Sequence, residues 1–206
     1  MAGRTLPPIE VAFARLFGQM ILTGLAALLL GRMRELVPPH FGLHFVRGGC
    51  LGLATTLFFS AVAVKPLADA IAVFFVEPMI LTALSALVLK EKVGWRRWSA
   101  CVVGFAGAMV AVRPGSSLFA FHALLPLGSA LLFAVYLLLT RRLAGAGTMI
   151  SAQFVTGLAG TVVIGAILAA TSLLGIPGAV ARWPAGVEWA MLSAIAAISI
   201  VGHGMV

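Results

Sequence analysis

The stretch "FFVEPMILTALSALVLKEKVGWRRW", Phe74 to Trp98, contains the features that decide the fold. It begins inside a long apolar run, places Glu77 and Pro78 side by side, and ends in a cluster of basic residues. About 20 consecutive apolar residues span a bilayer as a helix, and basic residues concentrate in cytoplasmic loops. We therefore predict a membrane helix whose C-terminal end is fixed at the cytoplasmic face. The residues of this predicted cytoplasmic anchor are Lys90, Glu91, Lys92, Arg96 and Arg97.

The composition of the whole chain is that of a membrane protein. Of its 206 residues, 62% are hydrophobic and 10% are charged, whereas charged residues make up about a quarter of a soluble domain. We therefore predict an all-α, multi-pass protein of the inner cell membrane, with the lipid bilayer as a partner. The Lys and Arg behind the net charge of +8 lie mostly in short loops between apolar runs. This placement indicates membrane orientation and argues against a nucleic-acid partner.

Apolar runs of bilayer length predict about seven spanning helices. They cover residues 9–30, 44–64, 67–89, 98–112, 119–139, 149–174 and 187–206. The connections are short and contain Pro and Gly, as in "VPPHFG" and "VRPGSS", which end one helix and redirect the chain. They leave no room for a soluble domain.

Basic residues predict the orientation of these helices. The loops after the first, third and fifth helices are rich in Lys and Arg, so by the positive-inside rule they face the cytoplasm. The chain would then begin outside, and its last apolar segment stops without an interfacial anchor, so both ends look cut. The basic residues of the predicted cytoplasmic side are Arg32, Arg34, Arg47, Lys90, Lys92, Arg96, Arg97, Arg141 and Arg142.

Two parts of the chain are faintly similar to each other. Residues 9–30 and 150–170 align with Phe13 beside Phe154, and the same offset sets the helix at 44–64 against the helix at 187–206. Under the predicted orientation the two aligned segments enter the membrane from opposite sides. This pattern is that of an inverted repeat, which is a common plan for secondary transporters.

Glu77 and Pro78 are unusual residues for the middle of a membrane helix. Glu77 lies roughly 15 Å from the external start of its helix, at about 1.5 Å per residue, which places it near the bilayer midplane. A carboxylate at that depth normally faces a bundle interior or a wet cavity, or it is protonated or hydrogen-bonded and ties helices together. Pro78 removes a backbone donor and predicts a bend. The bend would line a binding cavity, or it would be a static kink that improves packing.

Four further polar residues are candidates for a substrate cavity. Arg15 lies roughly 9 Å deep from the external side at about 1.5 Å per residue, where it could pair with Glu77 or hold an anionic substrate group. Alternatively, its guanidinium reaches back to the external interface. Gln19 follows Arg15 by one helical turn and extends the polar stripe inward. Tyr136 and Gln153 either line the cavity or bond to neighbouring backbone.

Motifs for catalysis and for cofactors are missing from the sequence. It has no nucleophile elbow, HExxH motif or phosphate-binding loop, which argues against an enzyme, an ATPase and a cofactor. Cys50 and Cys101 lack the spacing of metal ligands, so we expect no metal. Small residues at four-residue spacing let helix backbones approach closely, either within the fold or in a homodimer. These stripes are Ala100, Gly104 and Ala108, and Gly157, Thr161, Gly165 and Ala169.

Two longer segments resemble a known family. "LPPIEVAFARLFG", followed by "GLATTLFFSAVAVKPLADAIAVFFVEPMILTALSALVLKEKVGWRRWSACVVGFAGAMVAVRPG", is similar to the EamA domain of the drug/metabolite transporter superfamily. The points of resemblance are an Arg in an early helix, the Glu-Pro pair, "KEKV" at a helix end with the acidic Glu91, and a Gly-rich helix that closes the unit. Their combined spacing makes the resemblance extend across nearly the whole chain.

The resemblance implies a specific architecture and activity. Members are similar in having ten helices in two inverted five-helix repeats around a central cavity, without an ATPase. On this plan residues 1–114 are a first EamA repeat that lacks its first helix, and residues 115–206 are an incomplete second repeat. We expect a secondary transporter that exports small metabolites by alternating access. The alternative is a non-transporting membrane scaffold, or an inactive fragment that needs a partner chain.

Overall fold

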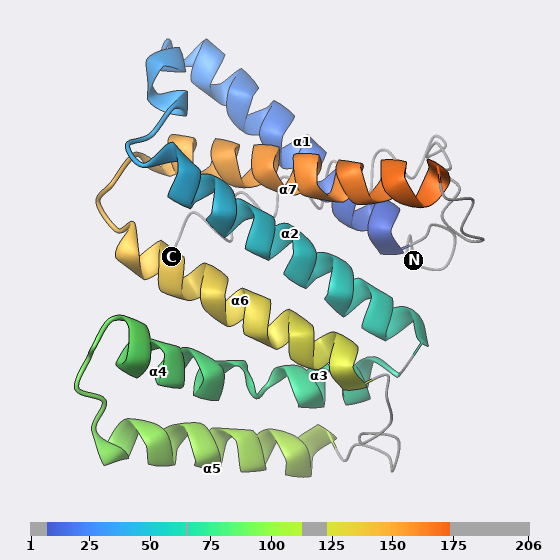
Figure 1. The fold of residues 1–206 in the computed structure, drawn as a ribbon, viewed down its shortest axis with the longest axis vertical. Helices are drawn as coiled ribbons and strands as arrows, with labels where there is room; N and C mark the ends of the chain where they lie inside the picture. Colours follow the sequence, from blue (N-terminus) through green and yellow to red (C-terminus); the bar gives the residue numbers. More distant parts are fainter. Residues whose placement is uncertain (1–7, 65, 113–122, 174–206) are drawn as a thin grey trace. The chain divides into compact units, whose positions relative to one another are not determined.

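The computed structural model describes residues 8–64, 66–112 and 123–173, and their regular structure is helical throughout (Figure 1). The predicted helix at 187–206 lies outside these residues. The described elements are α1 (Pro8–Leu29), the short 3-10 helix η2 (Met33–Leu36), α2 (Phe41–Val64), α3 (Leu67–Phe74), α4 (Glu77–Val88), α5 (Trp95–Val112), α6 (Leu124–Arg142) and α7 (Met149–Leu173).

Two helices begin earlier than their apolar runs predict. α2 begins at Phe41 rather than at residue 44, and α5 begins at Trp95 rather than at residue 98. The first N–H groups of α2 donate to the His40 carbonyl at 2.9 and 3.3 Å, and an N–H in the first turn of α5 donates to the Gly94 carbonyl at 3.0 Å. Hydropathy misses these turns because a membrane helix continues through the polar interface beyond the hydrocarbon core.

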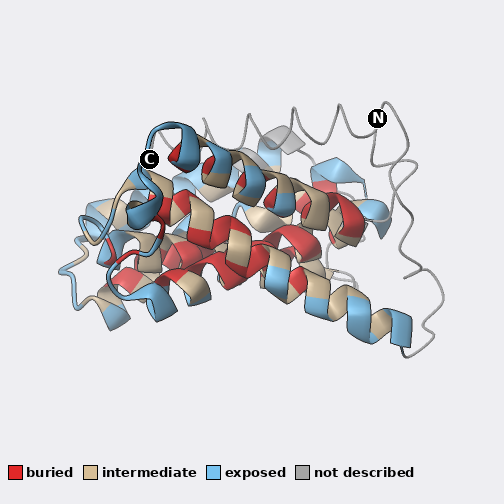
Figure 2. Ribbon diagram, turned by 90° about the horizontal axis from the view of Figure 1, so that it is seen from above, coloured by how far each residue is buried: buried red, intermediate tan, exposed pale blue. Residues whose placement is uncertain are grey.

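Five described helical stretches are long and apolar enough to cross a membrane. Their outward faces carry large apolar side chains, such as Ile21, Leu25 and Leu28 of α1, which are 51%, 49% and 60% exposed. Figure 2 shows the same division, with buried and exposed sides along the helices. A bilayer accepts such faces at no cost, so the fold is that of an all-α, multi-pass membrane protein. The five stretches are Ile9–Leu29, Phe41–Val64, Leu67–Val88, Leu124–Arg142 and Met149–Leu173.

The third span is interrupted where the Glu-Pro pair predicts a bend. α3 ends at Phe74 and α4 begins at Glu77, with Phe75 and Val76 between them. Both linking residues stay in the right-handed helical region, with φ and ψ of −63° and −4° for Phe75 and −71° and −15° for Val76. Pro78 is the second residue of α4, a position where the missing N–H of proline breaks no hydrogen bond within that helix. We call residues 75–76 the helix break.

The chain divides into two compact units. Unit 1 comprises Met1–Leu53 with Leu143–Val206, and unit 2 comprises Ala54–Arg142, so α2 contributes to both. In the described part of unit 1, α1 packs along α7. In unit 2, α3 and α4 each contact both α5 and α6 (Figure 1). This spatial division differs from the division into two sequence repeats, which stays a prediction.

Glycines bring α1 and α7 into close contact in unit 1. A Cβ atom added to Gly157 would lie 2.8 Å from the Met20 backbone nitrogen and 3.0 Å from the Leu16 carbonyl oxygen. Further along α7, a Cβ added to Gly165 would lie 3.3 Å from the Phe13 ring. Because the contacts move backward along α1 as they move forward along α7, the two helices are antiparallel. This is the relation expected for corresponding helices of an inverted repeat.

Candidate functional site

Two of the predicted cavity residues meet in unit 1. The Gln19 side-chain amide donates to the Gln153 side-chain oxygen at 2.6 Å and to the Gln153 carbonyl at 3.2 Å. Both side chains are buried, with 1% and 6% of their surface exposed. Among the described residues, the Gln19 side-chain oxygen has no hydrogen-bond partner. This glutamine pair therefore ties α1 to α7 and retains one buried acceptor that is available to another donor.

A buried arginine next to the glutamine pair was not predicted as a site residue. Arg47 Nη2 donates to the Ala152 carbonyl and to Thr156 Oγ1, both at 2.8 Å, and Arg47 is only 6% exposed. The positive-inside rule assigns Arg47 to the cytoplasmic side. Because α2 begins at Phe41, Arg47 belongs to the second turn of this helix. Two signals could have indicated this contact: the small residue Gly48 beside it, and the position of Thr156 one turn after Gln153.

Arg15 is half-buried on α1 and takes part in an interaction within the structure. It belongs to unit 1, whereas Glu77 belongs to unit 2. The predicted pairing of Arg15 with Glu77 therefore stays a prediction.

Glu77 is a buried carboxyl group at the start of α4. It lies at the middle of the 22-residue span Leu67–Val88, and 9% of its surface is exposed. Within the described part of the chain, its Oε1 atom is buried and accepts no hydrogen bond. The charge of Arg141, near the end of α6, acts on it. An ionisable group at this depth is a functional candidate because burying a charge in a membrane is costly.

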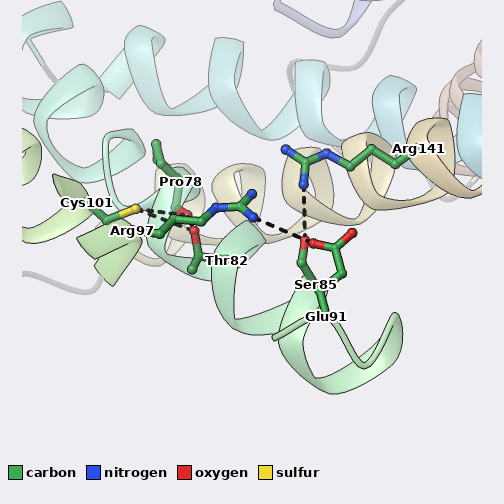
Figure 3. A network of polar contacts seen from close by, with 7 residues as sticks. All are labelled: Pro78, Thr82, Ser85, Glu91, Arg97, Cys101 and Arg141. Carbon is green, nitrogen blue, oxygen red and sulfur yellow. Dashed lines mark hydrogen bonds and ion pairs between the residues drawn. The ribbon is translucent and has the colours of Figure 1, made fainter. Parts of the chain in front are cut away.

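Polar contacts fasten α4 to both of its neighbours in unit 2. Thr82 Oγ1 donates to the Pro78 carbonyl at 2.7 Å and lies 3.4 Å from the Cys101 sulfur on α5. One turn further along α4, Arg141 of α6 donates to Ser85 Oγ at 3.4 Å. Figure 3 shows these contacts together, with Arg141 reaching Ser85 from α6 and the Cys101 sulfur facing Thr82. The contacts hold the part of the third span that follows Pro78.

The predicted anchor lies at the end of α4 and the start of α5. Lys90, with a φ of 53°, occupies the left-handed region, and the Glu91 N–H donates to the Ser85 carbonyl at 3.4 Å, which closes the end of the helix. Arg97 pairs with Glu91 at 3.6 Å (Figure 3). Lys92 and Arg96 are exposed, as are the neighbouring tryptophans Trp95 and Trp98. Exposed basic and indole side chains are typical of a membrane–water interface.

Tyr136 is buried in unit 2 at the end of a row of aromatic rings. Its ring lies 5.6 Å from that of Phe133 on the same helix, and Phe133 lies 5.7 Å from Phe74. Phe74 contacts Phe58 of α2 edge to face at 5.4 Å. These centroid distances are favourable for aromatic contacts. Because Phe74 is the last residue of α3, the row passes beside the helix break.

The described residues contain no group of three or more His, Cys, Asp or Glu side chains that could hold a metal ion. The polar features described in the two units are hydrogen-bonding groups, buried carboxyl groups such as Glu77, and buried or interfacial arginines.

Several proteins of known name are similar to this chain. It is 35% identical over 116 residues to a riboflavin transporter of Vibrio cholerae, covering 56% of this chain and 39% of that protein. It is 34% identical over 136 residues to a riboflavin transporter of Rhizobium johnstonii, and the match covers 66% of this chain and 43% of that protein. It is 26% identical over 192 residues to an S-adenosylmethionine uptake transporter of Rickettsia prowazekii, and the match covers 92% of this chain and 61% of that protein. The chain thus spans about half the length of these relatives.

A solved crystal structure has the same fold. It is 24% identical in sequence and matches with a TM-score of 0.69 over 98% of this chain and 69% of the solved chain. In sequence, the pattern of the EamA-like transporter family matches residues 1–113, which is more than half of the chain. This match agrees with the multi-pass helical fold. The chain therefore belongs to the EamA-like transporter family.

Proposed function

We propose that this protein transports a small polar metabolite across the cell membrane by alternating access. Membership of the EamA-like transporter family and the multi-pass helical fold support this proposal. Riboflavin and S-adenosylmethionine are the first substrates to test, because relatives bear these names.

The single observation that carries the proposal is the interruption of the third span beside a buried carboxyl group. In many transporters, discontinuous membrane helices line the substrate site near the bilayer midplane. Here the helix break adjoins Glu77, at the middle of the span Leu67–Val88. Polar contacts to α5 and α6 hold α4 on one side of the break. In this proposal α3, on the other side, changes its angle during transport.

The site residues have distinct roles in this proposal. Glu77 is a carboxyl group of the cavity, and Pro78 keeps the helix broken. Arg15 binds an anionic group of the substrate or pairs with Glu77. Gln19, Gln153 and Tyr136 line the cavity with hydrogen-bonding groups. The two inverted repeats, residues 1–114 and 115–206, provide the two sides that alternate, and a homodimer is the proposed assembly.

The direction of transport is part of the test. The sequence analysis predicts export, whereas the Rickettsia prowazekii relative is named for uptake. The full chain is reconstituted in proteoliposomes, and radiolabelled riboflavin or S-adenosylmethionine is supplied either inside or outside. We expect net movement of at least one substrate in one direction.

Glu77→Gln is the test variant, and Glu35→Gln, in the 3-10 helix η2 outside the spans, is the control. We expect Glu77→Gln to lower the rate of net transport about tenfold or more, which corresponds to a loss of about 1.4 kcal/mol. The control should transport at the wild-type rate. No net transport of either substrate or of a broad metabolite panel by the wild type would overturn the proposal. Transport that appears only when a second polypeptide is added would favour the alternative, a non-transporting membrane scaffold that needs a partner chain.

A further inference from the structure

The helix break leaves a backbone carbonyl without its usual donor. Pro78 has no N–H, so the hydrogen bond that residue 78 would donate to the Phe74 carbonyl cannot form. The N–H groups of Phe75 and Val76 donate to carbonyls earlier in α3, at 3.0 and 3.2 Å, and that of Met79 donates to Val76 at 3.0 Å. The Phe74 carbonyl is therefore an available acceptor in the middle of the membrane span, where an unsatisfied polar group is costly.

Glu77 can supply the missing donor. It follows Phe74 by three residues, and the two residues between them stay in the right-handed helical region. Its Oε1 atom is buried and has no hydrogen-bond partner in the part of unit 2 that the structure describes. An ionised carboxylate only accepts hydrogen bonds, but a protonated carboxyl group has one O–H donor. One proton bound to Glu77 would thus satisfy both groups if the new O–H donates to the Phe74 carbonyl.

The surrounding elements of unit 2 provide few other ionisable groups. Arg141 is the basic residue whose charge acts on Glu77, and its own side chain is held by Ser85. Arg97 of α5 is paired with Glu91 at the predicted cytoplasmic end. The described ionisable side chains on the elements packed around α4 are Asp69 of α3, Arg96, Arg97 and Cys101 of α5, and Tyr136, Arg141 and Arg142 of α6.

We propose that Glu77 and the Phe74 carbonyl form a proton-binding site that couples transport to the proton gradient. This inference rests on the proposed transport function. A proton from one aqueous side binds the Glu77 carboxylate, and the new O–H donates to the Phe74 carbonyl. On the other side the O–H bond breaks, the proton returns to water, and the carboxylate is regenerated. A proton fits better than a metal cation because the break offers one carboxyl group and one carbonyl, too few ligands for Na⁺ without several waters.

The site itself is tested without transport, by chemical labelling of the full chain in lipid vesicles. A lipid-soluble carbodiimide reacts with protonated carboxyl groups, and peptide mass spectrometry identifies the labelled residue. We expect an adduct on Glu77 whose yield falls as pH rises. In Pro78→Ala, the restored N–H competes for the Phe74 carbonyl, so the hydrogen bond from the protonated carboxyl group is weakened. The midpoint of labelling should then move to lower pH, by about one unit for a hydrogen bond of about 1.4 kcal/mol.

The coupling is tested by comparing net transport with exchange. A glutamine at position 77 donates to a carbonyl as a protonated glutamate does, but it cannot release a proton. We therefore expect Glu77→Gln to retain exchange of labelled for unlabelled substrate at equal pH, and to lose accumulation driven by a pH gradient. Asp69→Asn, which changes a buried carboxyl group in α3, is the matched control and should retain both activities.

Each result supports or overturns the inference. No Glu77 adduct at any pH, or an adduct whose yield does not depend on pH, overturns the proton site. Accumulation driven by a Na⁺ gradient at equal pH overturns the identity of the ion, and gradient-driven accumulation by Glu77→Gln overturns the coupling. If the wild type shows neither exchange nor net transport, the proposed function fails, whereas the labelling result still decides whether the proton site exists.

Discussion

At the scale of single residues, the polar groups buried in unit 1 hold the helices in register. Arg47 is an ionised group with 6% of its surface exposed, and it donates to two oxygens of α7. Hydrogen bonds that involve a charged donor are stronger than neutral ones, and an uncompensated buried charge is costly. The same reasoning applies in weaker form to the neutral glutamine pair, Gln19 and Gln153.

The glutamine pair should be measurable as an energetic coupling. We expect Gln19→Leu to destabilise the protein by about 1–3 kcal/mol, because the buried Gln153 side-chain oxygen loses its donor. Gln19→Leu combined with Gln153→Leu should cost less than the sum of the single variants, by about 0.6 kcal/mol or more. The measurement is a double-mutant cycle of thermal unfolding in detergent. Additive single-variant effects would show that the two side chains do not stabilise each other.

The Arg32–Glu35 pair predicts a small acid sensitivity outside the membrane spans. The hydrogen bond from Arg32 Nε to Glu35 Oε1, at 2.6 Å, lowers the pKa of Glu35 below its usual value of 4.5. A carboxyl group with a depressed pKa stabilises the fold at pH values above its pKa in the unfolded state. This stabilisation is lost as the pH falls through its pKa in the folded state. We expect the melting temperatures of wild type and Glu35→Gln to differ slightly near neutral pH and to converge well below pH 4.5. A pH-independent difference would contradict this assignment.

At the scale of helices, close packing depends on where glycines lie. Gly157 of α7 faces the backbone of α1, whereas Gly104 of α5 has no atom within 4 Å of an added Cβ among the described residues. The two positions belong to small-residue stripes that look alike in sequence. Only the structure shows which stripe a neighbouring described helix covers.

Adding one methyl group at each position should therefore have opposite effects. In Gly157→Ala the new Cβ meets backbone atoms of Met20 and Leu16, at 2.8 and 3.0 Å, which cannot move without shifting α1. We expect a loss of about 1–3 kcal/mol of stability from this overpacking. Gly104→Ala should be neutral or stabilising by up to about 1 kcal/mol, because alanine favours the helix. The measurement is the thermal unfolding of each variant compared with the wild type. Equal changes in stability would contradict the close contact between α1 and α7.

Hydrophobic run length and one proline were sufficient to predict much of the helical architecture. The apolar runs predict the five described spans, whereas the run at 98–112, which is helical in α5, is not one of them. The Glu-Pro pair predicts a bend where the structure has an interruption between α3 and α4. The burial of Arg47 could not be predicted in the same way. Its environment depends on the start of α2 at Phe41 and on the neighbouring backbone of α7, which is distant in sequence. The contact between Ser85 and Arg141 is likewise a tertiary pairing without a local signal.

At the scale of the whole molecule, the helix ends that meet within each unit are those that the sequence assigns to the same side of the membrane. Within unit 1, His44 near the start of α2 contacts the Ala146 carbonyl before α7 at 3.1 Å, so these two connections lie at the same end. Within unit 2, the contact between Arg141 and Ser85 brings the end of α6 beside the last turns of α4. Each unit thus gathers connections that the positive-inside rule assigns to the cytoplasm.

This orientation can be tested with single cysteines in a background where Cys50 and Cys101 are replaced by serine. Gly94→Cys lies in the predicted cytoplasmic anchor, and Pro66→Cys lies at the opposite end of the same span. A membrane-impermeant maleimide applied to intact cells should label Pro66→Cys but label Gly94→Cys only after permeabilisation. The reverse pattern would invert the predicted topology.

The helix break also has a mechanical consequence. The predicted anchor after α4 would hold one end of the third span among the headgroups, while the opposite end belongs to a helix of only 8 residues, Leu67–Phe74. At about 1.5 Å per residue this segment is roughly 12 Å long, so a tilt of about 20° at the break would displace its far end by about 4 Å. In the proposed alternating access, the third span would act as a lever with its pivot near mid-bilayer and would open a path on one face of the membrane while the other face stays still.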